Sequence, residues 1–160
     1  MRNRLVVVSF LGQSPNTKFR ADQWPLHMTL LPPFIINGSA DTLLSALREV
    51  ASSLAPFSVE TAGDALFGPN KDVPVSLIKP NQKLEEAHKK LAELVTHYGL
   101  KYEHPSISEG NYKFHITTQR GEKAPGVAEI PIYSFSLVDR QADGTMGLKQ
   151  VLETFIFKEK

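Results

Sequence analysis

Two short segments of the chain share one pattern, a histidine followed two residues later by a threonine: His27-Met28-Thr29 and His115-Ile116-Thr117. Both fall in runs of strand-forming residues, and in a strand residues i and i+2 point to the same face. Each segment would therefore present an imidazole beside a hydroxyl and turn Met28 or Ile116 into apolar packing. Chance would place two such pairs among five histidines and nine threonines roughly 3% of the time.

Together, the two segments would supply the groups needed for phosphodiester chemistry. A neutral imidazole takes a proton from a nucleophile, and a protonated imidazole gives one to a leaving group. The hydroxyls of Thr29 and Thr117 would hold the non-bridging oxygens of the phosphate as charge builds on them. The pattern thus indicates in-line attack with His27 and His115 as the acid–base pair. We expect no metal, because two histidines without a carboxylate at ligand spacing make a poor zinc site.

Either segment alone would be weak support for catalysis. A single histidine on a half-buried strand is usually a packed residue, and threonine is common in strands. The matched pair favours the catalytic interpretation. Two alternatives stay open: a module that binds nucleotides or RNA ends with little or no turnover, and a purely structural role if His27 and His115 lie far apart.

The remaining pattern predicts an α+β architecture in which a strand carries each histidine. Helices are expected between Ser39, as N-cap, and Pro56, and between Asn81, as N-cap, and Gly99. The Pro32-Pro33 pair should end the strand of His27, because proline cannot donate to a sheet ladder. Residues 103–113 should form a loop. The expected strands span residues 4–11, 26–31, 57–67, 73–78, 114–119, 132–139 and 148–157.

Composition narrows the class of protein. The 160 residues are 41% hydrophobic, which suits one folded domain over residues 1–160. A net charge of +1 argues against bulk binding of duplex nucleic acid but allows a pocket for one phosphate. The absence of cysteine excludes disulfides and thiolate chemistry. No apolar run approaches the roughly 20 residues of a membrane helix, and the N-terminal apolar run lacks a cleavage site, so we expect a cytoplasmic protein.

The two His-x-Thr segments, one in each half of the chain, resemble the motifs of the 2H phosphoesterase superfamily. This superfamily includes the 2′-5′ RNA ligases and the RNA 2′,3′-cyclic phosphodiesterases. The stretch from Leu30 to Phe34 is similar to the family's continuation after its first motif. The layout from Phe57 through the 73–78 strand into the second helix is similar as well.

This resemblance implies a bilobal fold with pseudo-twofold symmetry, in which two mainly antiparallel sheets surround a central cleft and a helix packs on each lobe. It implies His27 and His115 as general base and general acid, and Thr29 and Thr117 as phosphate ligands. The implied substrates are 2′,3′-cyclic phosphates or 2′-5′ linkages of RNA or nucleotides. No cofactor, membrane or obligate protein partner is implied, and we expect a monomer.

The other three histidines have simpler interpretations. His88 lies on the apolar side of the second helix, so we expect it in or next to the core. His97 stands near the C-terminus of that helix, where it would complement the helix dipole. His104 falls in the 103–113 loop, and only its location favours a role with substrate.

Four residues near the motifs are candidates for substrate contact. Trp24 and Phe34 flank the first motif and could stack on a base, although ordinary packing explains them equally well. Lys113 and Arg120 bracket the second motif and could steer a phosphate. Lysine and arginine side chains are, however, more often solvated charges on the protein surface.

Overall fold

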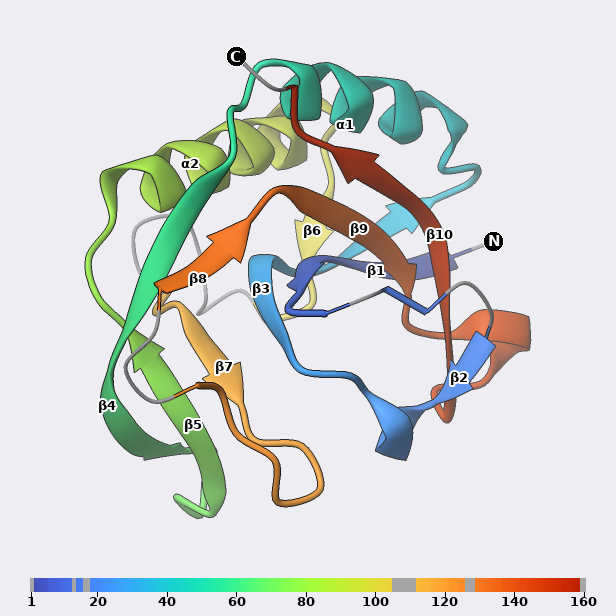
Figure 1. The fold of residues 1–160 in the computed structure, drawn as a ribbon. Coiled ribbons are helices and arrows are strands. Elements are labelled where there is room, and N and C mark those ends of the chain that lie inside the picture. The colour runs from blue at the N-terminus through green and yellow to red at the C-terminus, as the bar shows by residue number, and fades with distance from the viewer. Residues whose placement is uncertain (1, 13, 16–17, 105–111, 126–128, 159–160) are drawn as a thin grey trace.

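Ten strands and two α-helices occupy the part of the chain that the computed structural model describes, residues 2–12, 14–15, 18–104, 112–125 and 129–158. Figure 1 shows a strongly curled sheet with both helices next to each other along one side. In chain order the elements are β1 (Arg2–Phe10), β2 (Lys18–Arg20), the 3₁₀ turn η1 (Ala21–Gln23), β3 (His27–Asn37), α1 (Asp41–Ser52), β4 (Phe57–Phe67), β5 (Val73–Ile78), α2 (Gln82–His97), β6 (Lys101–Tyr102), β7 (His115–Thr117), β8 (Glu129–Ile132), β9 (Ser134–Asp139), the 3₁₀ turn η2 (Ala142–Gly144) and β10 (Leu148–Ile156).

The strands form one antiparallel run in the order β2-β10-β9-β1-β3-β7-β5-β4-β8, with β6 paired to β3. The expected α+β class and antiparallel pairing are confirmed. The two sheets that we expected are joined, because the two histidine strands, β3 and β7, pair directly with each other. Helix α1 packs against β10, and α2 packs against β3.

The expectation that Pro32-Pro33 would end the strand of His27 is wrong, since β3 continues to Asn37. Opposite it on β1, Leu5 pairs with Phe34 and Val7 pairs with Leu31, which leaves one extra residue on the β3 side. The two prolines therefore sit at a β-bulge, where the ladder is already interrupted and a missing N–H costs little.

The two helices differ in how well their caps were predicted. The Asn81 side chain accepts a hydrogen bond at 3.0 Å from the backbone three residues on, and Gly99 after α2 has a φ of +63°, so both expected ends are confirmed. The N-cap of α1 is Ala40 rather than Ser39. The Ser39 hydroxyl still accepts a hydrogen bond from the Asp41 N–H at 3.1 Å, although Ser39 lies one residue before the N-cap.

Several short strands differ from the sequence expectation. The strands β2, β6 and β8 have two to four residues each. Segments this short do not show the alternation of apolar and polar residues by which a strand is recognised in a sequence. The expected strand over 132–139 is split, because β8 ends at Ile132 and β9 begins at Ser134. The strand at His115 spans only three residues. Of the expected loop 103–113, residues 105–111 lie outside the described residues.

The sheet buries apolar residues on both faces. From β1, Leu5 and Val7 point into the main core beneath the helices. Val6, Val8 and Phe10 point to the other face, where Trp24 packs against the same cluster. A strand buried on both faces explains why this segment is continuously apolar in sequence. In the described part of the chain no helix is both long and apolar enough to cross a membrane.

A charged cluster ties β6 to the middle of the sheet. The Glu103 carboxylate follows β6 and its side chain is only 8% exposed. It accepts hydrogen bonds from Arg4 at 2.8 Å and from Arg140. Lys149, also buried, donates to the Arg140 carbonyl at 2.8 Å. This cluster fixes the chain shortly before it reaches the second motif.

Candidate active site

Strand register brings the four motif residues together on one face of the sheet. Met28 of β3 pairs with Ile116 of β7 in an antiparallel ladder, and both side chains are buried, 0% and 1% exposed. The residues on either side of this pair must point to the opposite face. Two cross-strand neighbours follow, His27 beside Thr117 and Thr29 beside His115. In standard sheet geometry the two histidines lie on a diagonal, with Cα atoms about 7–8 Å apart and Cβ atoms somewhat closer.

Both imidazoles are held by the same local hydrogen bond. Nδ1 of His27 lies 2.8 Å from the carbonyl oxygen of Pro25, and Nδ1 of His115 lies 2.8 Å from that of Lys113. A carbonyl oxygen can only accept, so Nδ1 of each ring carries a proton. In the neutral ring the lone pair is then on Nε2. Each histidine is thereby set up to exchange a proton through Nε2.

Aromatic side chains lie beside both histidine rings, which remain partly exposed. The ring of Trp24 lies 4.4 Å from that of His27, Phe10 lies 6.1 Å from it, and Phe67 lies 4.7 Å from the ring of His115. Burial lowers the pKa of His27 from 6.5 to about 4; the Pro25 carbonyl opposes this shift and the charge of His115 adds to it. Burial also lowers the pKa of His115, opposed by the Lys113 carbonyl. The two rings are close enough to influence each other's protonation.

A family model described as the 2′-5′ RNA ligase superfamily matches residues 13–134. The chain belongs to the 2′-5′ RNA ligase superfamily. Membership confirms the resemblance that the His-x-Thr motifs indicated. Among curated proteins, none matches the chain in sequence.

Solved structures share the fold of this superfamily member over nearly its whole length. A structure titled as a phosphoesterase has a TM-score of 0.64 at 15% identity, covering 98% of this chain and 99% of that one. Escherichia coli LigT in complex with 3′-AMP has a TM-score of 0.62 at 15% identity, covering 99% and 100%. The protein TT0787 of Thermus thermophilus has a TM-score of 0.56 at 21% identity, covering 98% and 99%.

Tyr112 is a residue of the site that the motif analysis of this superfamily member missed. Its ring lies 6.0 Å from that of His115. Burial raises its pKa, and the Thr29 side chain opposes this shift. The sequence does carry a signal, because Tyr112 stands three residues before His115 just as Trp24 stands three residues before His27. Each motif is therefore an aromatic-x-x-His-x-Thr segment.

The four candidates for substrate contact near the motifs have different environments in the structure. Phe34 is fully buried in the core beneath the helices, so the interpretation that it stacks on a base is wrong. Trp24 packs against the ring of His27. Arg120 is exposed and donates to the Trp24 carbonyl at 2.9 Å, which links the turn after the second motif to the segment before the first. Lys113 holds the His115 ring through its carbonyl.

The other histidines lie where the helix pattern placed them. His88 is 8% exposed, and its Nδ1 donates to the Leu30 carbonyl at 2.6 Å. His97 is the last residue of α2, as expected for a side chain that complements the helix dipole. His104 is exposed.

The burial of His27 predicts a stability that falls as the solution becomes acidic. Between pH 6.5 and about 4 the unfolded chain binds a proton at His27 that the folded protein does not. Stability should therefore drop through that window, by about 3 kcal/mol in total from this residue. Urea unfolding at pH 7 and pH 4.5 measures the drop in the wild type and in His27→Gln. Carboxylates contribute equally to the loss of stability in both proteins. The wild-type loss minus the His27→Gln loss therefore gives the contribution of His27. Equal drops would contradict the prediction.

Proposed function

We propose that this protein is a metal-independent phosphoesterase that hydrolyses 2′,3′-cyclic phosphates, or makes and breaks 2′-5′ linkages, on RNA ends or nucleotides. The proposal assigns general acid–base roles to His27 and His115. The observation that carries it is the direct pairing of the two motif strands at Met28 and Ile116, with both histidines on one face. LigT, a protein of similar fold, was crystallised with 3′-AMP, ATP and phosphate, which supports a nucleotide or phosphate ligand.

The strand pairing suits in-line displacement at phosphorus. An antiparallel pair has a local twofold axis perpendicular to the sheet, here midway between Met28 and Ile116. A phosphate bound over this axis would have one imidazole on each of two opposite sides, the relation required between an attacking and a leaving oxygen. Thr29 and Thr117, on the other diagonal, would donate to the non-bridging oxygens as negative charge develops there.

The environments of the two histidines favour His27 as the general base and His115 as the general acid in hydrolysis. His27 is the more deeply buried and holds its proton weakly, so a single proton shared by the pair resides on His115. His27 Nε2 then takes a proton from water as the water oxygen bonds to phosphorus. The bond between phosphorus and one ribose oxygen breaks, and His115 gives that oxygen its proton. In the reverse reaction the two roles exchange.

A cavity lies next to the segment before the first motif, and none of the four motif residues lines it. It has a volume of about 480 Å³ and lies next to the residues that precede His27. Two cations, Arg120 and Lys123, are among its lining residues, together with Leu11, Gly12, Pro25, Leu26, Glu122 and Pro125. This size is within the range of small-ligand sites.

Turnover of a short RNA ending in a 2′,3′-cyclic phosphate, with EDTA present, tests the function. We expect the wild type to open the ring and His115→Ala to lose this activity. His97→Ala, which changes a histidine at the end of α2, serves as the matched control and should retain activity. The position of the phosphate in the product identifies the bond that breaks.

Three results would argue against the proposal. A strict requirement for metal would contradict metal-independent catalysis, and equal rates for wild type and His115→Ala would remove the histidine from the mechanism. Tight nucleotide binding without any product would instead favour a binding module.

A further inference from the structure

A tight turn follows the second motif. Gln119 and Glu122 exchange two backbone hydrogen bonds at 2.8 Å, so that only Arg120 and Gly121 lie between them. Both central residues have a positive φ, +50° and +79°, as a type I′ turn requires. Figure 1 shows this turn, after β7, at the same end of the molecule as η1, which precedes the first motif.

The backbone of this turn is anchored to the strands on the β7 side of the site. The Thr118 N–H donates to the Pro74 carbonyl of β5 at 3.0 Å. After the turn, Nζ of Lys123 lies 3.0 Å from the carboxylate of Asp64 on β4. The position of the turn is therefore set by β4 and β5 rather than by the segment before β3.

The Arg120 side chain connects this turn to the segment before the first motif. Its Nη1 donates to the carbonyl of Trp24 at 2.9 Å and to that of Asp22 at 3.4 Å. The contact is exposed, so water competes for the guanidinium and we expect little stability from it. Its effect is on position. Because Pro25 has no N–H, the carbonyl is the only hydrogen-bonding group of the Trp24–Pro25 peptide.

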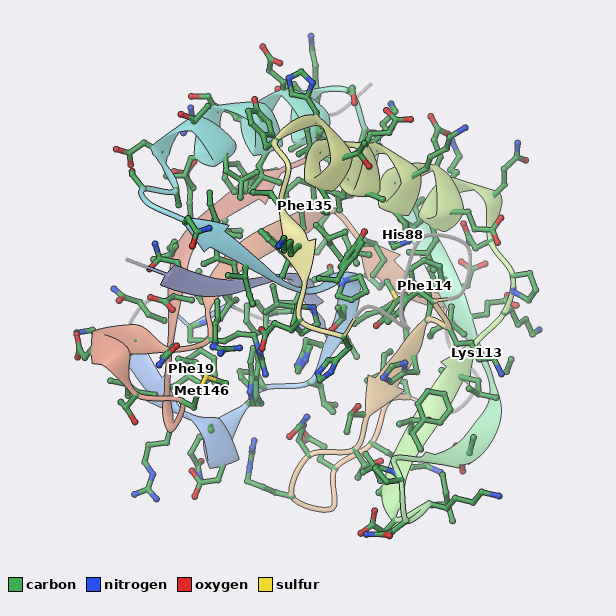
Figure 2. All side chains as sticks on the ribbon, turned by 180° about the vertical axis from the view of Figure 1, so that it is seen from behind. Phe19, His88, Lys113, Phe114, Phe135 and Met146 are labelled. Carbon is green, nitrogen blue, oxygen red and sulfur yellow. The ribbon has the colours of Figure 1, made fainter. Side chains whose placement is uncertain are left out.

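The Trp24–Pro25 peptide joins the two groups that hold the His27 ring. The Pro25 carbonyl accepts from Nδ1 at 2.8 Å, and the Trp24 ring lies 4.4 Å from the imidazole. Trp24 also contacts Phe19 of β2 at 5.0 Å. Figure 2 shows Phe19 on the opposite side of the molecule from Lys113, whose carbonyl holds the other histidine. A movement of the peptide would displace the carbonyl and the indole together.

Arginine is an unusual residue at the first central position of such a turn. Asparagine, aspartate and glycine are preferred there, because most side chains are disfavoured at positive φ. A residue held in a disfavoured conformation suggests a role for its side chain. The two carbonyl contacts of Arg120 are the role that the structure offers.

We propose that Arg120 is a positioning residue that holds the Trp24–Pro25 peptide in place, and so keeps the His27 ring with its proton on Nδ1 and its Nε2 lone pair available to the reaction. This inference rests on the proposed function. A general base needs this tautomer, because a proton on Nε2 would leave no lone pair there. The turn after the second motif would thereby control the base of the first.

Arg120→Asn tests the proposal, because asparagine is preferred at this position and should retain the turn. The nitrogen NMR shifts of the neutral His27 ring at pH 7 show which nitrogen carries the proton. In the wild type we expect the proton on Nδ1, and in the variant a measurable fraction should move to Nε2. We expect kcat to fall about tenfold while KM stays within about twofold, since the base is misplaced and no substrate contact is lost.

Two controls accompany this variant. The His115 ring of Arg120→Asn should keep its proton on Nδ1, because the Lys113 carbonyl holds it independently of Arg120. Lys71→Asn removes another exposed cation with a positive φ, +51°, from the turn between β4 and β5. It should leave both kcat and the His27 ring unchanged.

The NMR measurement needs no substrate, so it separates this inference from the proposed function. If the wild type does not turn over but the His27 proton moves in Arg120→Asn, the positioning role stands and the function fails. If the wild type turns over and the variant matches it in kcat, the function stands and the positioning role is overturned. A higher KM with an unchanged His27 ring would mean that Arg120 binds substrate directly, which would also overturn it.

Discussion

Alanine in place of His27 or His115 is expected to lower kcat/KM for a 2′,3′-cyclic phosphate by about 10²–10⁴-fold, the usual contribution of a positioned general acid or base. Nδ1 of each ring is hydrogen-bonded to a backbone carbonyl at 2.8 Å, which fixes the orientation of the ring. When one histidine is replaced, the other therefore cannot turn to take over its proton transfer. The double variant should be little worse than the poorer single variant, because both histidines act in one transition state.

Steady-state kinetics of the two single variants and the double variant, at several pH values, measure this effect. The wild type should show a bell-shaped profile with an optimum below pH 6.5, since burial lowers both histidine pKa values. Each single variant should lose one limb of the bell. Losses that multiply in the double variant would mean that the residues act in separate steps, and a single-variant loss below tenfold would remove that residue from proton transfer.

Glu103→Gln is expected to destabilise the protein by about 3 kcal/mol, the usual cost of removing one partner from a buried ion pair. Burial alone would raise the pKa of Glu103, but Arg140 and then Arg4 more than offset this, so the pKa lies below 4.5 and the group is charged. Without the carboxylate, Arg4 and Arg140 would lose their shared ion-pair partner, and the buried Lys149 would keep only the charge of Asp139 to oppose that of Arg140.

Urea unfolding at pH 7 measures this loss as a lower midpoint with an unchanged slope. Glu93→Gln, on the exposed side of α2, is the matched control and should stay within about 0.5 kcal/mol of wild type. A loss below that margin for Glu103→Gln would show that the arginines find other partners or water, and that the cluster does not hold β6 in place.

Local signals in the sequence predicted local structure well. The Asn81 cap and the Gly99 stop of α2 depend on residues within one helical turn, and both are confirmed. The side-by-side histidine and threonine of each motif depend only on strand alternation. The prediction that the two prolines end the strand of His27 was wrong, because they lie at a β-bulge in the pairing of β3 with β1. That pairing joins segments far apart in the sequence.

The candidate site required information that no local pattern contains. The pairing of Met28 with Ile116 joins positions far apart in the chain, and the sequence offered only the repeated motif as a hint of it. The position of Tyr112 beside His115 depends in turn on that pairing and on the packing of α2 behind it. A tyrosine inside a polar stretch resembles any loop residue until the two strands are placed together.

The backbone bonds to Nδ1 of both histidines have a consequence for successive catalytic cycles. In the proposed hydrolysis, one turnover leaves the base protonated and the acid deprotonated, so the pair ends each cycle in the opposite state from the one in which it began. A ring that could pass a proton onward through Nδ1 would reset itself through the protein interior. Here both inner nitrogens face carbonyl oxygens that cannot take a proton at ordinary pH. Resetting must therefore occur through Nε2, by exchange with water after the product has left.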